Sequence, residues 1–438
     1  MSRSLDTFAP NLAALGRSRA PLLTLDLSVV TPLFGGGVTA REVDWDRPVC
    51  GKSVRGQLRF WWRACRGVRY TTVQDLFAAE AAIWGSTEQP ASVEVVVETV
   101  DKGRVLDFEV WQRDRDMPRY GLFPFFPQPA RDGQPGKPPA ACIEGIRFRL
   151  SLTGPATHFA DVEAAVWAWI MFGGVGARTR RGCGTLFCER DGFRPTHETL
   201  PAQARTHILA GPRRLAIPQL SGGGILIAKQ LAQQETAKQC WVAAVKAMQD
   251  FRQKPGFARN PGPQPNRPKR SRWPEADSIR EIADRAAGRR LTQVHPPTHA
   301  ARPFFPRADL GLPLVFHFIG EPYGVTLQPV APVTEGLKQS RMASPIILKA
   351  LPLSRQTAVP IAVLLSAPHV WDADAPGIGF KGGTALPLTD IDQSSSPARN
   401  AAVPPMGGST VREAFWEFAK SEWASTGSGW DGLEVMLP

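Results

Sequence analysis

The chain has 438 residues, 43% hydrophobic and 21% charged, which is the composition of an ordinary globular protein long enough for two or more cores. Its net charge of +12 predicts a polyanionic partner, with nucleic acid as the first candidate and an anionic membrane as the second. We find no signal peptide and no uncharged stretch of membrane-spanning length, so we expect a cytoplasmic protein.

The six cysteines are scattered without CxxC spacing, and no two of the seven histidines show HxH spacing. This pattern predicts reduced, packed cysteines and argues against a disulfide framework, a metal site or a bound cofactor. Most of the thirteen tryptophans fall within predicted helices or strands, so we expect most of them in the core, with one or two left as candidates to stack on a base.

The first half of the chain predicts one α/β domain at residues 21–200, after a loose arm at residues 1–20. Hydrophobic periodicity predicts strands at 22–30, 92–100, 108–110, 146–152 and 184–189, and helices at 53–66, 75–85 and 160–172. A Pro/Phe/Gly-rich insertion occupies 118–140. The order of the main elements is the βαββαβ plan of a ferredoxin-like, RRM-type domain.

A second α/β domain is predicted at residues 201–438. Its expected helices are 225–251, 277–290 and 412–423, and its expected strands are 314–319, 344–350 and 360–365. Residues 252–274 carry six prolines and seven cations without any acidic residue, which predicts a flexible, basic insertion.

The most distinctive stretch is residues 172–186, where five glycines frame three arginines. It lacks the Gly-Lys-Ser/Thr ending of a Walker A loop and the third glycine of a dinucleotide fingerprint. Glycines let a backbone approach a ligand closely, so the loop favours a phosphate backbone as ligand. The candidate RNA-binding residues here are Gly174, Gly176, Arg178, Arg180, Arg181, Gly182 and Gly184. A glycine-rich turn with solvated arginines is the alternative.

The predicted helix at 53–66 carries a second basic motif. Arg55, Arg59, Arg63 and Arg66 recur every three or four residues, with Ser53 as the expected N-cap and Lys52 before it. No acidic residue stands at i±3 or i±4 to pair these arginines. The stripe and the helix N-terminus therefore predict phosphate contacts, with a solvated basic face as the alternative. A further glycine-rich loop, Gly35, Gly36 and Gly37, is followed by Arg41.

Together these motifs resemble the RAMP superfamily of CRISPR systems, and more narrowly subunit one of the type III-B (Cmr) effector. The resemblance is carried by residues 32–37, 54–63, 80–86, 173–184, 306–313 and 341–345. It implies an α+β protein of two ferredoxin-like domains with long insertions and a glycine-rich loop, without a catalytic centre, metal or cofactor. It also implies CRISPR guide RNA, target single-stranded RNA and other RAMP subunits as partners, near the 3′ end of the guide, and no membrane.

Carried onto this chain, the resemblance implies RNA contacts at Gly35 to Gly37, Arg55, Arg59 and the loop from Gly174 to Gly184. Arg41, Lys52, Arg63, Arg341 and Lys381 are our additions to that surface. Phosphate contacts of this kind would bind RNA with a steep salt dependence and little sequence preference.

Two other functions are weighed against this one. A RAMP-type ribonuclease would need a general base or paired carboxylates, for which His158, His197 and the Asp44/Asp46 pair are the candidates. No histidine or carboxylate stands in the glycine-rich loop itself, which argues against this function. A structural cap that meets only protein is the third alternative.

Overall fold

The structure is a computed structural model that covers the chain in several stretches. It describes residues 21–130, 135–229, 235–264, 269–287, 305–317, 324–330, 341–370, 372, 377–381, 405–406, 409–424 and 431–438. The arm expected at residues 1–20 lies outside the described residues. Within them, no helix combines the length and the apolar character needed to cross a membrane.

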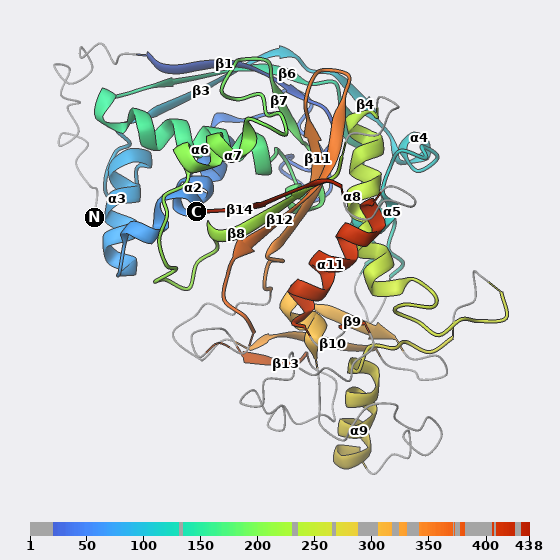
Figure 1. The fold of residues 1–438 in the computed structure, drawn as a ribbon. Coiled ribbons are helices and arrows are strands. Elements are labelled where there is room, and N and C mark those ends of the chain that lie inside the picture. The colour runs from blue at the N-terminus through green and yellow to red at the C-terminus, as the bar shows by residue number, and fades with distance from the viewer. Residues whose placement is uncertain are drawn as a thin grey trace, which may run out of the picture.

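The first half of the chain builds a four-stranded antiparallel sheet (Figure 1). Its strands, in chain order, are β1 (Pro21–Val29), β3 (Glu94–Asp101), β6 (Arg147–Thr153) and β7 (Leu186–Cys188). They lie in the order β3-β6-β1-β7. Helices α2 (Gly51–Arg66) and α3 (Val73–Trp84) follow the first strand, and α6 (Phe159–Phe172) follows the third. The predicted order of strands and helices is confirmed.

The second half builds another antiparallel sheet with the same connectivity. Its strands are β8 (Gln219–Ile227), β11 (Ile346–Pro352), β12 (Ala358–Ser366) and β14 (Leu433–Met436). Their spatial order is β11-β12-β8-β14, so both sheets place their strands as second, third, first and fourth. Helices α8 (Ala237–Gln253) and α11 (Val411–Trp423) follow the first and third strands, and each begins with a capping box.

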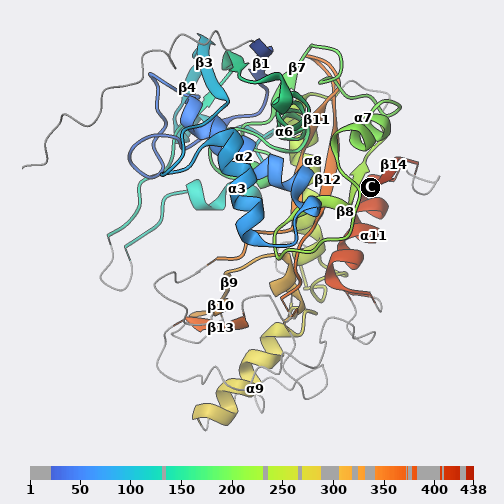
Figure 2. The same cartoon turned by 90° about the vertical axis from the view of Figure 1, so that its left-hand side faces the viewer.

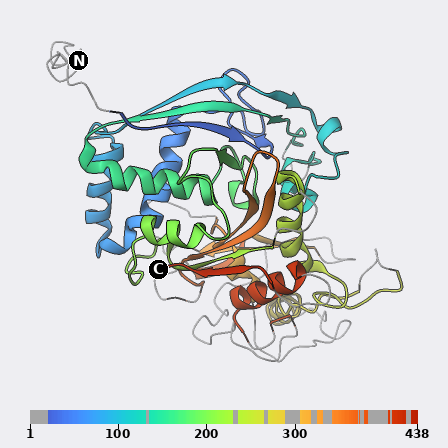
Figure 3. The same ribbon diagram turned by 45° about the horizontal axis from the view of Figure 1, so that its top comes forward.

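Sheets and helices alternate in four layers, which Figure 3 shows from the side. One core joins the inner face of the first sheet, helices α2 and α6, and residues of the second sheet such as Ile347 and Val363. Their chain neighbours Leu348 and Ala362 point the other way, into a core with α8 and α11. Successive side chains of a strand face opposite sides, so the second sheet is buried on both faces. The first sheet keeps one face in solvent.

Smaller elements surround these layers. A three-stranded sheet joins β2 (Leu33–Phe34), β4 (Arg104–Leu106) and β5 (Cys142–Glu144), and another joins β9 (Leu314–His317), β10 (Gly324–Val330) and β13 (Gly377–Lys381). The short helices are α4 (Phe108–Trp111), α5 (Arg119–Leu122) and α7 (Leu200–His207). Helix α9 (Glu275–Ala287) lies with the β9-β10-β13 sheet at one end of the molecule (Figures 1 and 2).

Two predicted elements differ from the structure. Residues 219–227 form strand β8, so the helix expected from residue 225 begins only at Ala237. Gly223 lies so close to the neighbouring strand that a Cβ there would stand 2.3 Å from the carbonyl oxygen of Leu364, so three glycines permit a tightly packed strand here. The strand expected at 108–110 is the helical turn α4, which begins after Asp107.

The basic insertion at 252–274 is anchored at both of its described ends, against the expectation of a flexible segment. The backbone of Asn260 pairs in both directions with residues 269 and 270, at 2.9 Å each. Trp273 is fully buried against Phe251 at the end of α8. The aromatic anchor overrides the loop-forming composition, because burying a tryptophan offsets the entropy of ordering nearby residues.

The predicted tryptophan core is confirmed by the burial of six side chains, Trp61, Trp62, Trp84, Trp111, Trp167 and Trp169. Five of the six cysteines are also buried and all six are free thiols. These six indole rings are packed inside the protein and are not available to stack on an RNA base.

Candidate nucleic-acid interface

The two glycine-rich loops lie against each other and form one unit. The amide of Ala177 donates to the carbonyl of Phe34 at 2.7 Å, and the amide of Gly184 donates to Pro32 at 3.0 Å. The hydroxyl of Thr31 donates to the carbonyl of Gly182 at 2.7 Å. The loops are 140 residues apart in sequence, so only the pairing of β1 with β7 brings them together.

The glycines of residues 173–184 serve the packing of the loop itself. A Cβ at Gly174, Gly176 or Gly182 would stand 2.4 to 2.7 Å from an atom of the protein, and one at Gly184 would stand 1.9 Å from the carbonyl oxygen of Val175. The amides of Gly182 and Gly184 already donate to Thr179 and Pro32. The prediction that these glycine amides approach a phosphate is therefore wrong for Gly182 and Gly184. Gly176 alone of the four is exposed.

Arg180 and Arg181 fasten the loop to the edge of the second sheet. The guanidinium of Arg180 donates to the carbonyl of Ser344 and lies over the Phe60 ring of α2, 5.3 Å from its centroid. Arg181 donates to the carbonyl of Ile346 at 2.9 Å. Burial lowers the pKa of Arg180 and of Arg181 to about 10, so both remain charged at neutral pH. They contribute positive potential, while their donors are partly used within the protein.

Arg178 differs from Arg180 and Arg181 in its backbone conformation and in its contacts. It adopts a left-handed conformation with φ of 59°, which is uncommon outside glycine and clusters at functional sites. Its guanidinium lies over the ring of Phe123, and its Nε is buried without a hydrogen-bond partner. Burial lowers its pKa, with the neighbouring charge of Arg341 as a lesser cause in the same direction.

Arg341 comes to this loop from the second half of the chain. Met342, the next residue, pairs in both directions with Leu312, and Ser344 accepts from Arg180. The motifs at 306–313 and 341–345 thus meet at the glycine/arginine loop. Arg341 is exposed. In the part of the chain that the structure describes, neither it nor the three loop arginines has a carboxylate partner.

Most arginines of the stripe on helix α2 are paired with carboxylates, unlike those of the glycine/arginine loop within the described stretches. Arg59 and Arg63 both bind Glu80 of α3, a side chain only 3% exposed. Arg66 is buried, with Asp161 and the carbonyl of His207 as partners. The expectation of an unpaired stripe is wrong, because α3 and α6 supply carboxylates that helical spacing within α2 does not reveal.

The first turn of α2 keeps its cations in solvent. The helix begins at Gly51 after Cys50, so Ser53 is not the N-cap, and the first turn has no acidic residue. Lys52 and Arg55 are both exposed there. Among the described residues these two lack a carboxylate partner, and they remain candidates for phosphate contacts.

The remaining predicted residues divide between exposed and structural positions. Gly36 is exposed with a φ of 103°, and Gly37 is half-buried, whereas Gly35 is buried against Ala177. Arg41 donates to the carbonyls of Pro124, Phe126 and Pro138, so its guanidinium clamps the insertion at 118–140 to the glycine-rich loop. Lys381 lies in β13, opposite Thr326.

A buried lysine that the sequence analysis missed supports the loop from beneath. Lys349 of β11 is fully buried, and its Nζ donates to the carbonyls of Gly173 at 2.8 Å and Ile170 at 3.4 Å. These groups end helix α6, where unpaired carbonyls and the helix dipole favour a cation. Burial lowers the pKa of Lys349 to about 7. The sequence signal for this buried cation is a single lysine within a run of apolar strand residues.

We expect stability to depend on pH through Lys349. Its pKa is about 7 in the folded chain and 10.5 ordinarily, so between these values the unfolded chain binds more protons and the free energy of unfolding rises with pH. The contribution is about 1.4 kcal/mol per pH unit. Chemical unfolding from pH 6.5 to 9.5 should show that the free energy of unfolding rises more with pH for wild type than for Lys349→Met. The exposed control Lys246→Met should show the same pH dependence as wild type. Parallel curves for wild type and Lys349→Met would contradict this assignment.

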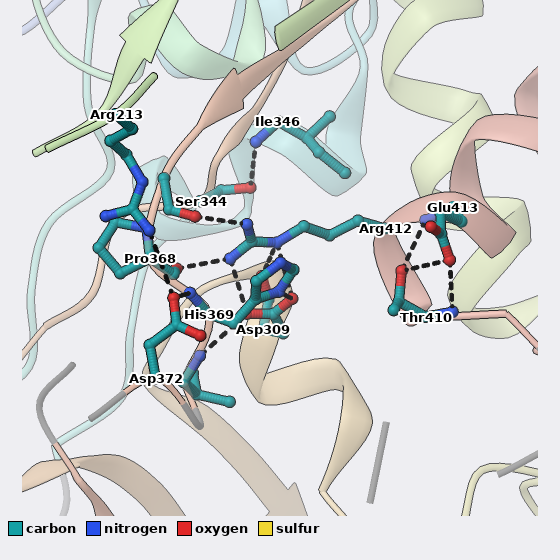
Figure 4. A network of polar contacts seen from close by, with 12 residues as sticks. Arg213, Asp309, Ser344, Ile346, Pro368, His369, Asp372, Thr410, Arg412 and Glu413 are labelled. Atoms are coloured by element: carbon teal, nitrogen blue, oxygen red, sulfur yellow. Dashed lines mark hydrogen bonds and ion pairs between the residues drawn. The ribbon is translucent and has the colours of Figure 1, made fainter. Parts of the chain in front are cut away.

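A second missed feature is the buried polar network that holds the 306–313 motif in place (Figure 4). Asp309 is fully buried and contacts Arg412 of α11 twice at 2.7 Å, and it accepts from the amide of Val370 at 3.1 Å. His369 lies 2.9 Å from the same carboxylate. Arg412 also donates to the carbonyls of Ala367 and Pro368. This network ties together three segments distant in sequence.

The residues proposed for a ribonuclease do not meet. His158 precedes α6, whereas the glycine/arginine loop follows it, so about 20 Å of helix separates them. The Nε2 of His197 lies 3.2 Å from the carbonyl of Ala228. Asp44 caps the amide of Arg47, and Asp46 pairs with Lys102. In the described stretches, no three His, Cys, Asp or Glu side chains are arranged to hold a metal ion.

The open face of the first sheet is polar along β1 and β6. Thr24, Asp26, Arg147 and Arg149 point outward along β1 and β6, and Arg149 pairs with Asp26 at 2.9 Å. In these two strands and β3, no aromatic residue points outward for a base to stack on. The geometry therefore favours loops over the sheet as the platform for a nucleic acid.

Comparison of the sequence with known proteins gives a match to a family model and to two related proteins. The RAMP superfamily model matches residues 26–187. The protein "CRISPR system Cmr subunit Cmr1-2" of Pyrococcus furiosus is 30% identical over 175 residues, which span 37% of this chain and 91% of that protein. "CRISPR system Cmr subunit Cmr1-1" of the same organism is 24% identical over 145 residues, 31% of this chain and 38% of that protein.

Among solved structures, the crystal structure of Cmr1 from Pyrococcus furiosus in its apo form has a TM-score of 0.48 at 13% identity. The similarity covers 79% of this chain and 88% of that one. A cryo-EM structure of the type III-B Cmr-beta complex bound to cognate target RNA and AMPPnP contains a chain with a TM-score of 0.41 at 10% identity, covering 79% and 94%.

Proposed function

This chain belongs to the RAMP superfamily as a Cmr subunit 1-like protein, and from that premise we propose that it is a non-catalytic RNA-binding subunit of a type III-B CRISPR effector complex. In this role it contacts guide or target single-stranded RNA near the 3′ end of the guide, beside other RAMP subunits, in antiviral defence. Each of its two sheets, together with the helices that follow its first and third strands, is in this proposal a ferredoxin-like unit.

One observation carries the proposal: cations from both halves of the chain gather at the glycine/arginine loop without acidic partners among the described residues. Arg178 and Arg341 come from separate segments and lie close enough to repel each other. Holding like charges together costs free energy, and a polyanion relieves that cost. Arg180 and Arg181 add to the potential from inside the loop.

In this function the residues have distinct roles. Arg178 and Arg341 bind phosphates directly, and Lys52 and Arg55 extend the track at the first turn of α2. Gly36 and Gly176 are exposed, and a Cβ at Gly36 would meet nothing within 4 Å, so Gly36 leaves the surface open for the RNA backbone. Arg180, Arg181 and the buried glycines hold the loop in shape, and Arg59 and Arg63 serve mainly the α2–α3 ion pairs.

Salt dependence of RNA affinity tests this proposal. We expect wild type to bind a single-stranded RNA oligomer with a steep log–log salt dependence, and Arg178→Ala/Arg341→Ala to flatten the slope by about 0.7 per lost phosphate contact. Fluorescence anisotropy over a salt series measures this. The matched control is Arg149→Ala on the open sheet face, which should keep the wild-type slope. An unchanged slope in the double variant would refute the assignment, and a flattened slope in the control would move the site to the sheet.

The same samples test the ribonuclease alternative. The RNA should keep its length on a denaturing gel with and without Mg²⁺ and after addition of a chelator. Shortening that His158→Ala or His197→Ala abolishes would overturn the non-catalytic assignment.

A further inference from the structure

The short 3₁₀ turn Phe123–Phe125, in the insertion at 118–140, carries an aromatic ring that the protein core does not use. Phe123 is 63% exposed even though the guanidinium of Arg178 lies 5.4 Å from its ring centroid. We propose that Phe123 is a stacking platform for one base of single-stranded RNA, directly beside the phosphate site at Arg178 and Arg341. This inference rests on the proposed function and deepens it.

The turn is anchored on both sides of the exposed ring. Leu122 is fully buried, and Phe125 stacks on Phe34 with centroids 4.4 Å apart and rings 5° from parallel. Arg41 holds the carbonyls of Pro124 and Phe126. Phe123 is therefore held in solvent by a fixed backbone, so a base that stacks on it does not have to order the turn first.

The chemistry around the ring suits a nucleotide. An exposed aromatic face accepts any base, and an adjacent cation takes the phosphate that follows it. Arg178 supplies that cation with a guanidinium on the ring itself, a left-handed backbone and a buried Nε that has no partner. A nucleotide would thus have its base and its phosphate contacted by neighbouring side chains.

Charge favours RNA over a protein partner at this ring. An apolar docking site for protein needs only the exposed ring, whereas this ring lies within a group of arginines that have no carboxylate partner in the described stretches. Phe77 on α3 is 53% exposed, and its ring provides a matched comparison.

The test compares wild type, Phe123→Ala, Phe123→Trp and Phe77→Ala of the full chain on two probes. One probe is a single-stranded oligouridylate, and the other has the same number of phosphates but abasic sites in place of bases. We expect Phe123→Ala to weaken oligouridylate binding about 5- to 100-fold with an unchanged salt slope, because a base contact is lost and no phosphate contact is lost. Phe123→Trp and Phe77→Ala should bind like wild type, and the abasic probe should not distinguish any of the four.

Cross-linking gives an independent readout. RNA carrying 5-iodouridine should cross-link on irradiation to the peptide that contains Phe123, and mass spectrometry identifies that peptide. The thermal unfolding midpoint of Phe123→Ala should match wild type, since the ring is exposed.

The outcomes separate this inference from the proposed function. If Phe123→Ala binds oligouridylate like wild type while Arg178→Ala/Arg341→Ala flattens the salt slope, the stacking role is refuted and RNA binding at the loop stands. If Phe123→Ala weakens binding of both probes equally, the ring acts on the phosphate site and not on a base, which also refutes it. If no variant changes RNA binding, both proposals fail and the ring is a surface for protein.

Discussion

Replacing Gly184 by alanine is expected to cause one of the largest losses of stability that a single methyl group can cause in this chain. The new Cβ would stand 1.9 Å from the carbonyl oxygen of Val175, and the φ of 63° is unfavourable for alanine by about 1 to 2 kcal/mol. The backbone pair from Val175 to Gly184, 2.9 Å long, must open to admit the methyl group. We expect a loss of roughly 3 to 5 kcal/mol in the free energy of unfolding, measured by urea denaturation.

Gly192→Ala is the matched control for this substitution. Gly192 also has a positive φ, 86°, but a Cβ there meets nothing within 4 Å, so only the conformational cost of about 1 to 2 kcal/mol applies. The difference between the two variants isolates the steric clash inside the loop. Equal losses would mean that the loop yields freely and that its glycines do not fix its shape.

Replacing Asp309 by alanine is the second change for which we expect a large effect. Arg412 is 4% exposed, and without Asp309 its charge would be buried without a carboxylate among the contacts in Figure 4. Breaking a buried ion pair in this way costs about 3 to 5 kcal/mol. The loss should appear in chemical denaturation, and it should loosen the joint between the 306–313 motif, α11 and the segment at 367–370.

A double variant makes this test specific to charge. Asp309→Ala/Arg412→Met removes both buried charges, so it should recover much of the stability that Asp309→Ala loses. The exposed pair of Arg355 and Glu189 is the comparison, and Glu189→Gln should leave stability nearly unchanged. A double variant no more stable than Asp309→Ala would show that packing, and not the uncompensated charge of Arg412, sets the cost.

Much of the fold could be predicted because local pattern and tertiary environment agree. Strand β1 alternates buried leucines with exposed Thr24 and Asp26, which is the pattern of a sheet with one open face. Where they disagree, the prediction is wrong. Strand β8 is buried on nearly its whole length and contains three glycines, so its sequence shows neither the alternation of a half-exposed strand nor the spacing of an amphipathic helix. The predicted boundary between the two domains at residue 200 stays a prediction.

The candidate site divides in the same way. Sequence pattern identified the glycine/arginine loop, the α2 cations and Arg341. Of these, Arg178, Arg341 and the first-turn cations of α2 stay predictions as RNA contacts. It did not identify Glu80 as the partner of Arg59 and Arg63, since ion pairs between helices follow no local spacing. Nor did it single out Phe123 in the proline-rich insertion, because tertiary packing decides which one of several phenylalanines is exposed.

The sequence by itself determined the order of strands and helices in the first half, the burial of the tryptophans and the resemblance to the RAMP superfamily, because these depend on residue type and short-range spacing. Only the tertiary structure decided which cations remain without acidic partners. Charge neutralisation acts over a few ångströms in space, and the neighbours of Arg59, Arg178 and Arg341 come from segments tens to hundreds of residues away. The distinction between a structural arginine and a ligand-binding arginine is therefore made by the fold.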